Sequence, residues 1–136
     1  MDRRNNQEEK SMCESDRMDE NRLSILTNML VKLWIRAHGY EKAKASALEG
    51  HERLMAIVID DAFTPAEIYL AHQPESRKLI REYAEQLIAL IKPEMVSCVD
   101  EFLGCKVIGY SIDPNPRSGS VLCLFQFENQ VSERLG

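Results

Sequence analysis

Three groups of residues in this 136-residue chain are of types that do chemistry: an acidic pair, the histidines, and a loop rich in turn-forming residues. Asp60 and Asp61 follow an apolar run and precede a helix start, a place where metal and phosphate sites occur. His72 is one of three histidines, and Arg117 lies in the loop 113–119, where it can meet an anion or an acidic partner. Together these four residues suggest a small-molecule site in a pocket between helices and sheet.

Each group also has a plainer interpretation, which we favour. An acidic pair caps or solvates a strand end more often than it binds a metal, and a carboxylate at a helix start opposes anion binding. His38, His51 and His72 do not have the spacing of a zinc pair on one helix face, so we expect all three at the surface. The loop 113–119 is interpreted as a tight polar hairpin connection.

Motifs for catalysis or cofactor binding are missing from the sequence. It contains no Gly-x-Ser-x-Gly turn, no Walker loop and no Rossmann glycine pattern. Cys98, Cys105 and Cys123 lie in apolar contexts without Cys-x-x-Cys spacing, so we expect free, buried thiols rather than a metal site. We therefore predict that the protein is not an enzyme and holds no metal or cofactor.

Composition and charge exclude further classes of function. The net charge of −5 argues against nucleic-acid binding, which needs a surplus of Lys and Arg. No apolar run approaches the roughly 20 residues that cross a bilayer. The polar N-terminus lacks the apolar segment of a secretory signal. We expect a cytoplasmic protein without direct membrane insertion.

The elements that must position these residues follow from apolar periodicity. Residues 1–20 are predicted to be a disordered polar tail, 21–130 a single domain and 131–136 a C-terminal tail. The predicted order is helix, β-hairpin, short helix, long kinked helix, β-hairpin. This order is typical of an α+β fold with about four mostly antiparallel strands and helices on one face.

Three helices are expected. The first begins its apolar spacing at Leu23 and stops at Gly39. The second opens at Thr64, which forms a capping box with Glu67, and Pro65 suits its first position. Pro74 keeps this helix short. The third runs over about 75–103, and Pro93 is expected to kink or divide it.

Four strands are expected, two before and two after the second and third helices. The run 54–59 is predicted to be a central strand, preceded by a weaker one at 44–48, and the last hairpin comprises 105–112 and 121–127. In the last strand both faces are apolar, with Leu122 and Leu124 on one side, so this strand is also expected to be central or covered twice.

The first helix is apolar on more than one side. Leu26, Leu30 and Trp34 form the stripe that one sheet would cover, yet Met29 and Ile35 extend it to a second side. Soluble monomers rarely expose such a patch, so we predict a C₂ homodimer whose interface includes this helix. The competing explanation is that the long helix covers the first helix within one chain. Candidate interaction residues are therefore Met29, Trp34, Ile35, Asp60, Asp61, His72 and Arg117.

Several segments resemble a known family. They are 37–43 (AHGYEKA), 63–71 (FTPAEIYLA), the long charged helix with Arg77, Arg81 and 92–94 (KPE), and 103–108 (LGCKVI). They resemble the MpsC-like family of small bacterial proteins, described as the C component of a sodium-translocating, membrane-potential-generating system. The resemblance covers most of the chain after the tail.

The resemblance implies a cytoplasmic accessory protein associated with a membrane transport system for ions or inorganic carbon. It supplies no catalytic residues that can be carried over. The leading hypothesis is therefore a non-enzymatic binding or regulatory module, peripheral to the inner membrane through a membrane-protein partner. The alternative is a small-molecule sensor domain or small enzyme.

Overall fold

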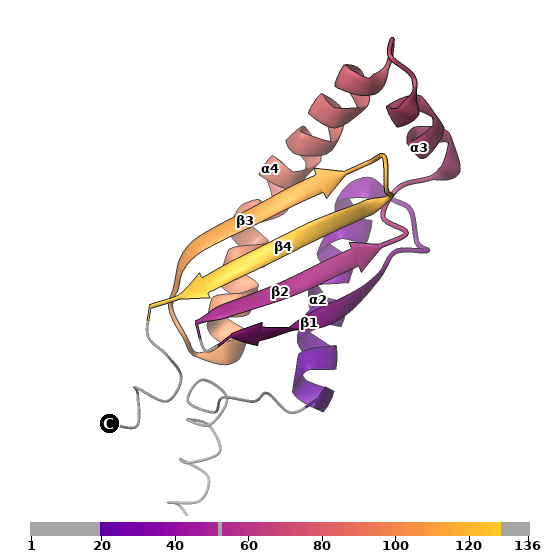
Figure 1. Ribbon diagram of the computed structural model, residues 1–136. Helices are drawn as coiled ribbons and strands as arrows, with labels where there is room; N and C mark the ends of the chain where they lie inside the picture. Colours follow the sequence, from indigo (N-terminus) through magenta and orange to yellow (C-terminus); the bar gives the residue numbers. More distant parts are fainter. Residues whose placement is uncertain (1–19, 52, 129–136) are drawn as a thin grey trace, which may run out of the picture.

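The computed structural model describes residues 20–51 and 53–128. Within these ranges the chain forms three helices and four strands (Figure 1). The elements are α2 (Glu20–His38), β1 (Lys44–His51), β2 (Leu54–Asp60), α3 (Pro65–His72), α4 (Arg77–Leu103), β3 (Val107–Asn115) and β4 (Ser120–Phe127). The predicted α+β fold is confirmed. The predicted tails at 1–20 and 131–136 lie outside the described residues, apart from Glu20.

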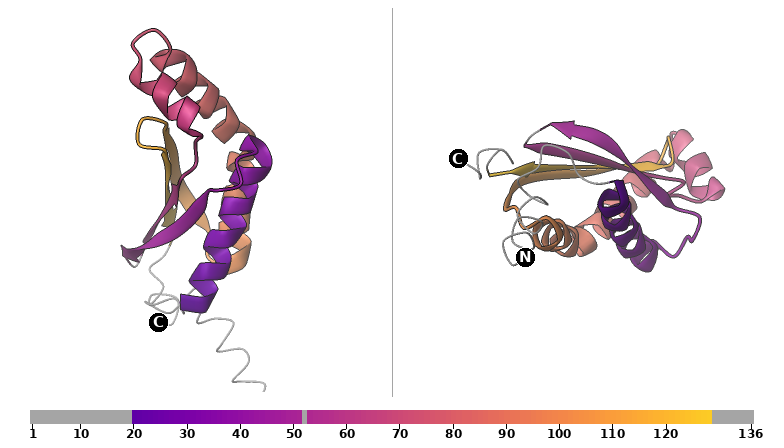
Figure 2. Two further views of the ribbon diagram at one scale, coloured as in Figure 1. Left: turned by 90° about the vertical axis from the view of Figure 1, so that its right-hand side faces the viewer. Right: turned by 90° about the horizontal axis from the view of Figure 1, so that it is seen from below.

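The four strands form one antiparallel sheet in the order β1-β2-β4-β3. The last strand of the chain therefore lies at the centre of the sheet, as its two apolar faces predicted. Figure 2 shows α2 and α4 side by side on one face of the sheet. We call this the inner face, and we call the opposite face, which no described helix covers, the outer face.

Strand β3 is longer than predicted. The predicted loop began at Asp113, but Asp113 and Pro114 continue the strand and pair with Leu122 and Val121. Pro114 has no N–H to donate, and the ladder tolerates it because β3 is an edge strand. Gly119 closes the turn with a φ of 79°, a backbone conformation that glycine adopts without a steric penalty.

Pro93 does not divide α4, which continues through it as one helix of 27 residues. The neighbouring side chains Ile91 and Met95 are buried against the core and hold the helix on both sides of the proline. We infer that this packing offsets the hydrogen bond that Pro93 cannot make. The helix ends at Gly104, which has a left-handed φ of 69°.

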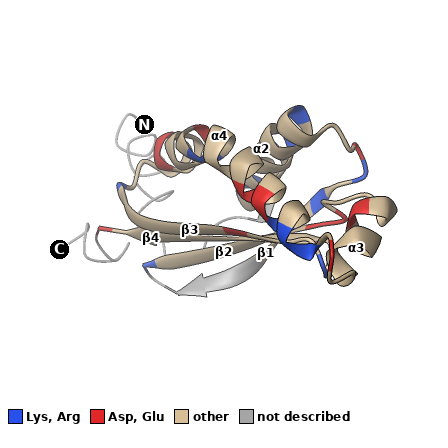
Figure 3. Ribbon diagram, turned by 90° about the horizontal axis from the view of Figure 1, so that it is seen from above, with Lys and Arg blue, Asp and Glu red and all other residues tan. Residues whose placement is uncertain are grey.

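The core lies between the inner face of the sheet and the two long helices. Alternate residues of β2 and β4 point into it, and Figure 3 shows that these central strands carry little charge along their length. In α4 the buried row includes Ala84, Ile88 and Leu103, whereas Tyr83 is exposed. The largest fully buried side chains are Trp34, Phe63, Phe125, Leu26, Leu30, Ile57, Ile59, Met95, Val99, Val121 and Cys123.

Candidate functional site

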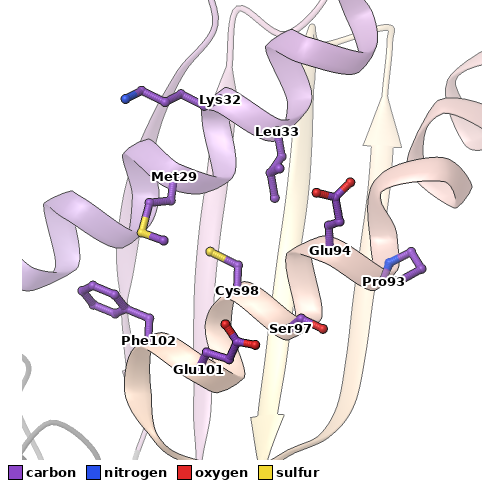
Figure 4. A pocket seen from close by; sticks show the side chains of 9 residues that line it. All are labelled: Met29, Lys32, Leu33, Pro93, Glu94, Ser97, Cys98, Glu101 and Phe102. Carbon is purple, nitrogen blue, oxygen red and sulfur yellow. The ribbon is translucent and has the colours of Figure 1, made fainter.

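A groove with a volume of about 680 Å³ lies between α2 and α4, with the sheet behind it (Figure 4). We call it the α2/α4 groove. Along each wall the lining side chains are spaced about one helical turn apart, because residues four apart lie on the same side of a helix. Met29 and Leu33 extend from α2, while Cys98 and Phe102 extend from α4 toward them. The full lining is Met29, Lys32, Leu33, Pro93, Glu94, Ser97, Cys98, Glu101 and Phe102.

The groove combines an apolar floor with an acidic wall. Glu94 and Glu101 stand on the α4 side and are exposed to solvent. Glu94 forms an ion pair with Arg36 of α2, which joins the two helices at one end of the groove. Both partners are more than half exposed, so this pair contributes little to stability. Glu101 has its carboxylate available beside the apolar residues.

Cys98 is a free thiol on the α4 wall of the groove. Burial raises its pKa, and the negative charge of Glu101 raises the pKa further. A thiol with a raised pKa carries little thiolate at neutral pH and is a weak nucleophile. Cys98 therefore serves the groove as an apolar contact rather than as a reactive group.

We expect Glu101→Gln to make Cys98 react faster with iodoacetamide at pH 8. Removing the charge lowers the pKa of the thiol and increases its thiolate fraction, but the increase stays modest because burial is the larger cause. Site-resolved mass spectrometry measures the rate. The matched control is Glu94→Gln, which lines the same groove without contributing to the raised pKa. An equal or larger acceleration by the control would contradict this prediction.

A second cluster lies where the end of α2 meets the start of α3. The His38 side chain is only 3% exposed, and its Nε2 lies 2.9 and 3.0 Å from the two carboxylate oxygens of Glu67. The His38 ring stacks on Trp34 with centroids 5.1 Å apart, and Phe63 and Tyr83 meet it at 5.7 and 6.4 Å. We call this the His38 cluster.

The carboxylate of Glu67 is held by several donors at once. It accepts hydrogen bonds from the backbone N–H and the hydroxyl of Thr64, at 2.8 and 3.1 Å, and the Thr64 hydroxyl accepts one from the Glu67 N–H. The predicted capping box is thus confirmed. Tyr83 also bonds to Glu67, and its pKa is raised by burial first and by this carboxylate second. Glu67 therefore links α3 to α2 through His38 and to α4 through Tyr83.

Comparison with known families identifies the family to which this chain belongs. The family model described as Na⁺-translocating membrane potential-generating system (MpsC) matches residues 38–129, well over half of the chain. The chain belongs to the MpsC family. A search of curated proteins found no match, and neither did a search of solved structures.

The MpsC match covers β1 to β4 and begins at His38. Two of the segments that carried the sequence resemblance, 37–43 and 63–71, meet in the His38 cluster through the contact between His38 and Glu67. Within 20–51 and 53–128, no helix of this MpsC-family chain has both the length and the apolar character to cross a membrane.

The predicted acidic and basic candidates lie at the two ends of α3 and in the β3–β4 turn. Asp60 and Asp61 lie at the end of β2, and Arg117 lies in the β3–β4 turn. This turn is next to the end of β2, since the Ala62 N–H donates a hydrogen bond to the Gly119 carbonyl at 2.8 Å. Asp61 pairs with Lys44 at 3.5 Å. His72 lies apart, exposed at the other end of α3. Among the described residues no group of three or more His, Cys, Asp or Glu side chains can hold a metal ion.

The apolar candidates of α2 separate into two environments. Trp34 is fully buried in the core, where its Nε1 donates to the Ala62 carbonyl at 2.9 Å, so it offers no exposed surface. Ile35 is partly buried against the core, whereas Met29 is exposed and lines the groove. Ile25 is exposed as well.

Two further sequence expectations are wrong. His38 is buried, not at the surface, because the aromatic rings around it and Glu67 replace water on both sides of the imidazole. Cys105 is disulfide-bonded rather than free, and no cysteine spacing in the sequence had indicated a bond. Cys98 and Cys123 are free thiols as predicted. The side chain of His51 lies outside the described residues.

Proposed function

We propose that this MpsC-family protein is a non-enzymatic accessory subunit of a membrane transport system. The α2/α4 groove would bind a helical segment on the cytoplasmic side of a membrane-protein partner. The family description supports a role in a Na⁺-translocating system. The groove is the single observation that carries the docking part of the proposal.

The shape of the groove suits a helix. Two parallel rows of residues one turn apart, with Met29 and Leu33 on one wall and Cys98 and Phe102 on the other, form an apolar trough. Amphipathic helices bind such troughs through apolar anchors spaced three and four residues apart. Met29 adds adaptability, because its unbranched side chain adjusts to different partners.

The charge of the groove suits a cytoplasmic segment of a membrane protein. Such segments carry an excess of Lys and Arg. The α4 wall presents Glu94 and Glu101, and the whole chain has a net charge of −5. A basic residue next to the apolar anchors of the partner would meet Glu101, whose carboxylate stands free of the Arg36 ion pair.

Fractionation of native cells that express the tagged full-length chain tests this proposal. We expect the chain to sediment with membranes at low salt, and Met29→Glu or Glu101→Lys to release it into the supernatant. The matched controls are Leu90→Glu and Glu85→Lys, since both residues are exposed on α4 outside the groove. Thermal melting checks that each variant folds.

Two outcomes would refute the proposal. One is a chain that stays in the supernatant at low salt in cells that carry the transport system. The other is a membrane-bound chain that the groove variants and the control variants release equally, which would mean that the groove is not the contact.

A small-molecule sensor is the second candidate, and the volume of the groove favours it. Ligand pockets typically measure about 300–1,000 Å³, and this groove falls inside that range. A ligand at a hundred times its dissociation constant stabilises the folded state by about 2.7 kcal/mol, which a thermal-shift screen of nucleotides, metal ions and bicarbonate detects. A shift that Met29→Glu abolishes would favour this candidate over the docking role.

A further inference from the structure

We draw no further inference here: the strongest candidate, the apolar stripe that Leu54 and Val58 of β2 form with Leu122 of β4 on the outer face of the sheet, is flanked by a Lys44 side chain that pairs with Asp61 of the same chain, and nothing in the structure shows what covers it.

Discussion

Trp34→Ala is expected to lower the free energy of unfolding by about 3–5 kcal/mol, the range for deleting a large aromatic side chain from a core. Trp34 is fully buried. Its ring meets Phe63 edge-on at 5.4 Å and stacks on His38, so the substitution removes contacts from both the core and the His38 cluster. The Ala62 carbonyl also loses its bond from Nε1.

Urea denaturation followed by far-UV circular dichroism measures this loss, since Trp34 is the only tryptophan and the variant has no tryptophan fluorescence. Trp34→Phe is the control, because it keeps an aromatic ring against Phe63 but removes the Nε1 bond, and it should cost less. A loss below about 1 kcal/mol for Trp34→Ala, typical of surface substitutions, would mean that Trp34 is not part of the core.

Glu67→Ala is expected to cost about 2–4 kcal/mol, because it removes the acceptor of several partly buried donors at once. His38 Nε2 and the Thr64 N–H both lose their partner, and the His38 side chain is too buried for water to replace the carboxylate readily. Thr64→Ala is the comparison. It removes only the cap and should cost about 1 kcal/mol. Equal losses for the two variants would show that the contact between His38 and Glu67 adds no stability.

Glu67→Ala should also change the stability of the protein at alkaline pH. The pKa of Tyr83 is raised in the folded state, so above pH of about 10 the unfolded chain loses this proton first. The contribution of Tyr83 to stability is therefore complete below that pH and is lost as the pH rises through the folded pKa. Without Glu67, two of the three causes of the raised pKa, its charge and its hydrogen bond, are gone, and the absorbance of tyrosinate should appear at lower pH. An unchanged titration would mean that burial alone protects Tyr83.

Local signals in the sequence predicted the parts of the fold that depend on neighbouring residues. Thr64 and Glu67 form the predicted capping box within four residues, and Gly39 ends α2 with a positive φ of 96°. Such features need no knowledge of distant segments. The central place of β4 was also predictable, because both faces of that strand are apolar.

Features that depend on distant segments escaped prediction. His38 was assigned to the surface because it lies at a helix end, yet Glu67, 29 residues later, folds over it. The α2/α4 groove joins residues of α2 to residues of α4 that lie at least 60 positions later in the chain. Met29 was predicted as an interaction residue, but nothing in the sequence placed it beside Phe102 or Glu101. The only early signal was the breadth of the apolar surface on α2.

The strand order also determines when this protein can fold during synthesis. Of the described strands β4 is the last to be made, yet it lies between β2 and β3 and joins the two halves of the sheet. Until residues 120–127 have left the ribosome, β2 has one unpaired edge and β3 has no partner. Unpaired apolar strands of this kind are sites of aggregation in incomplete chains. Fragments that end before Ser120 should therefore be insoluble, and chaperones that bind nascent chains should hold this chain until β4 has emerged.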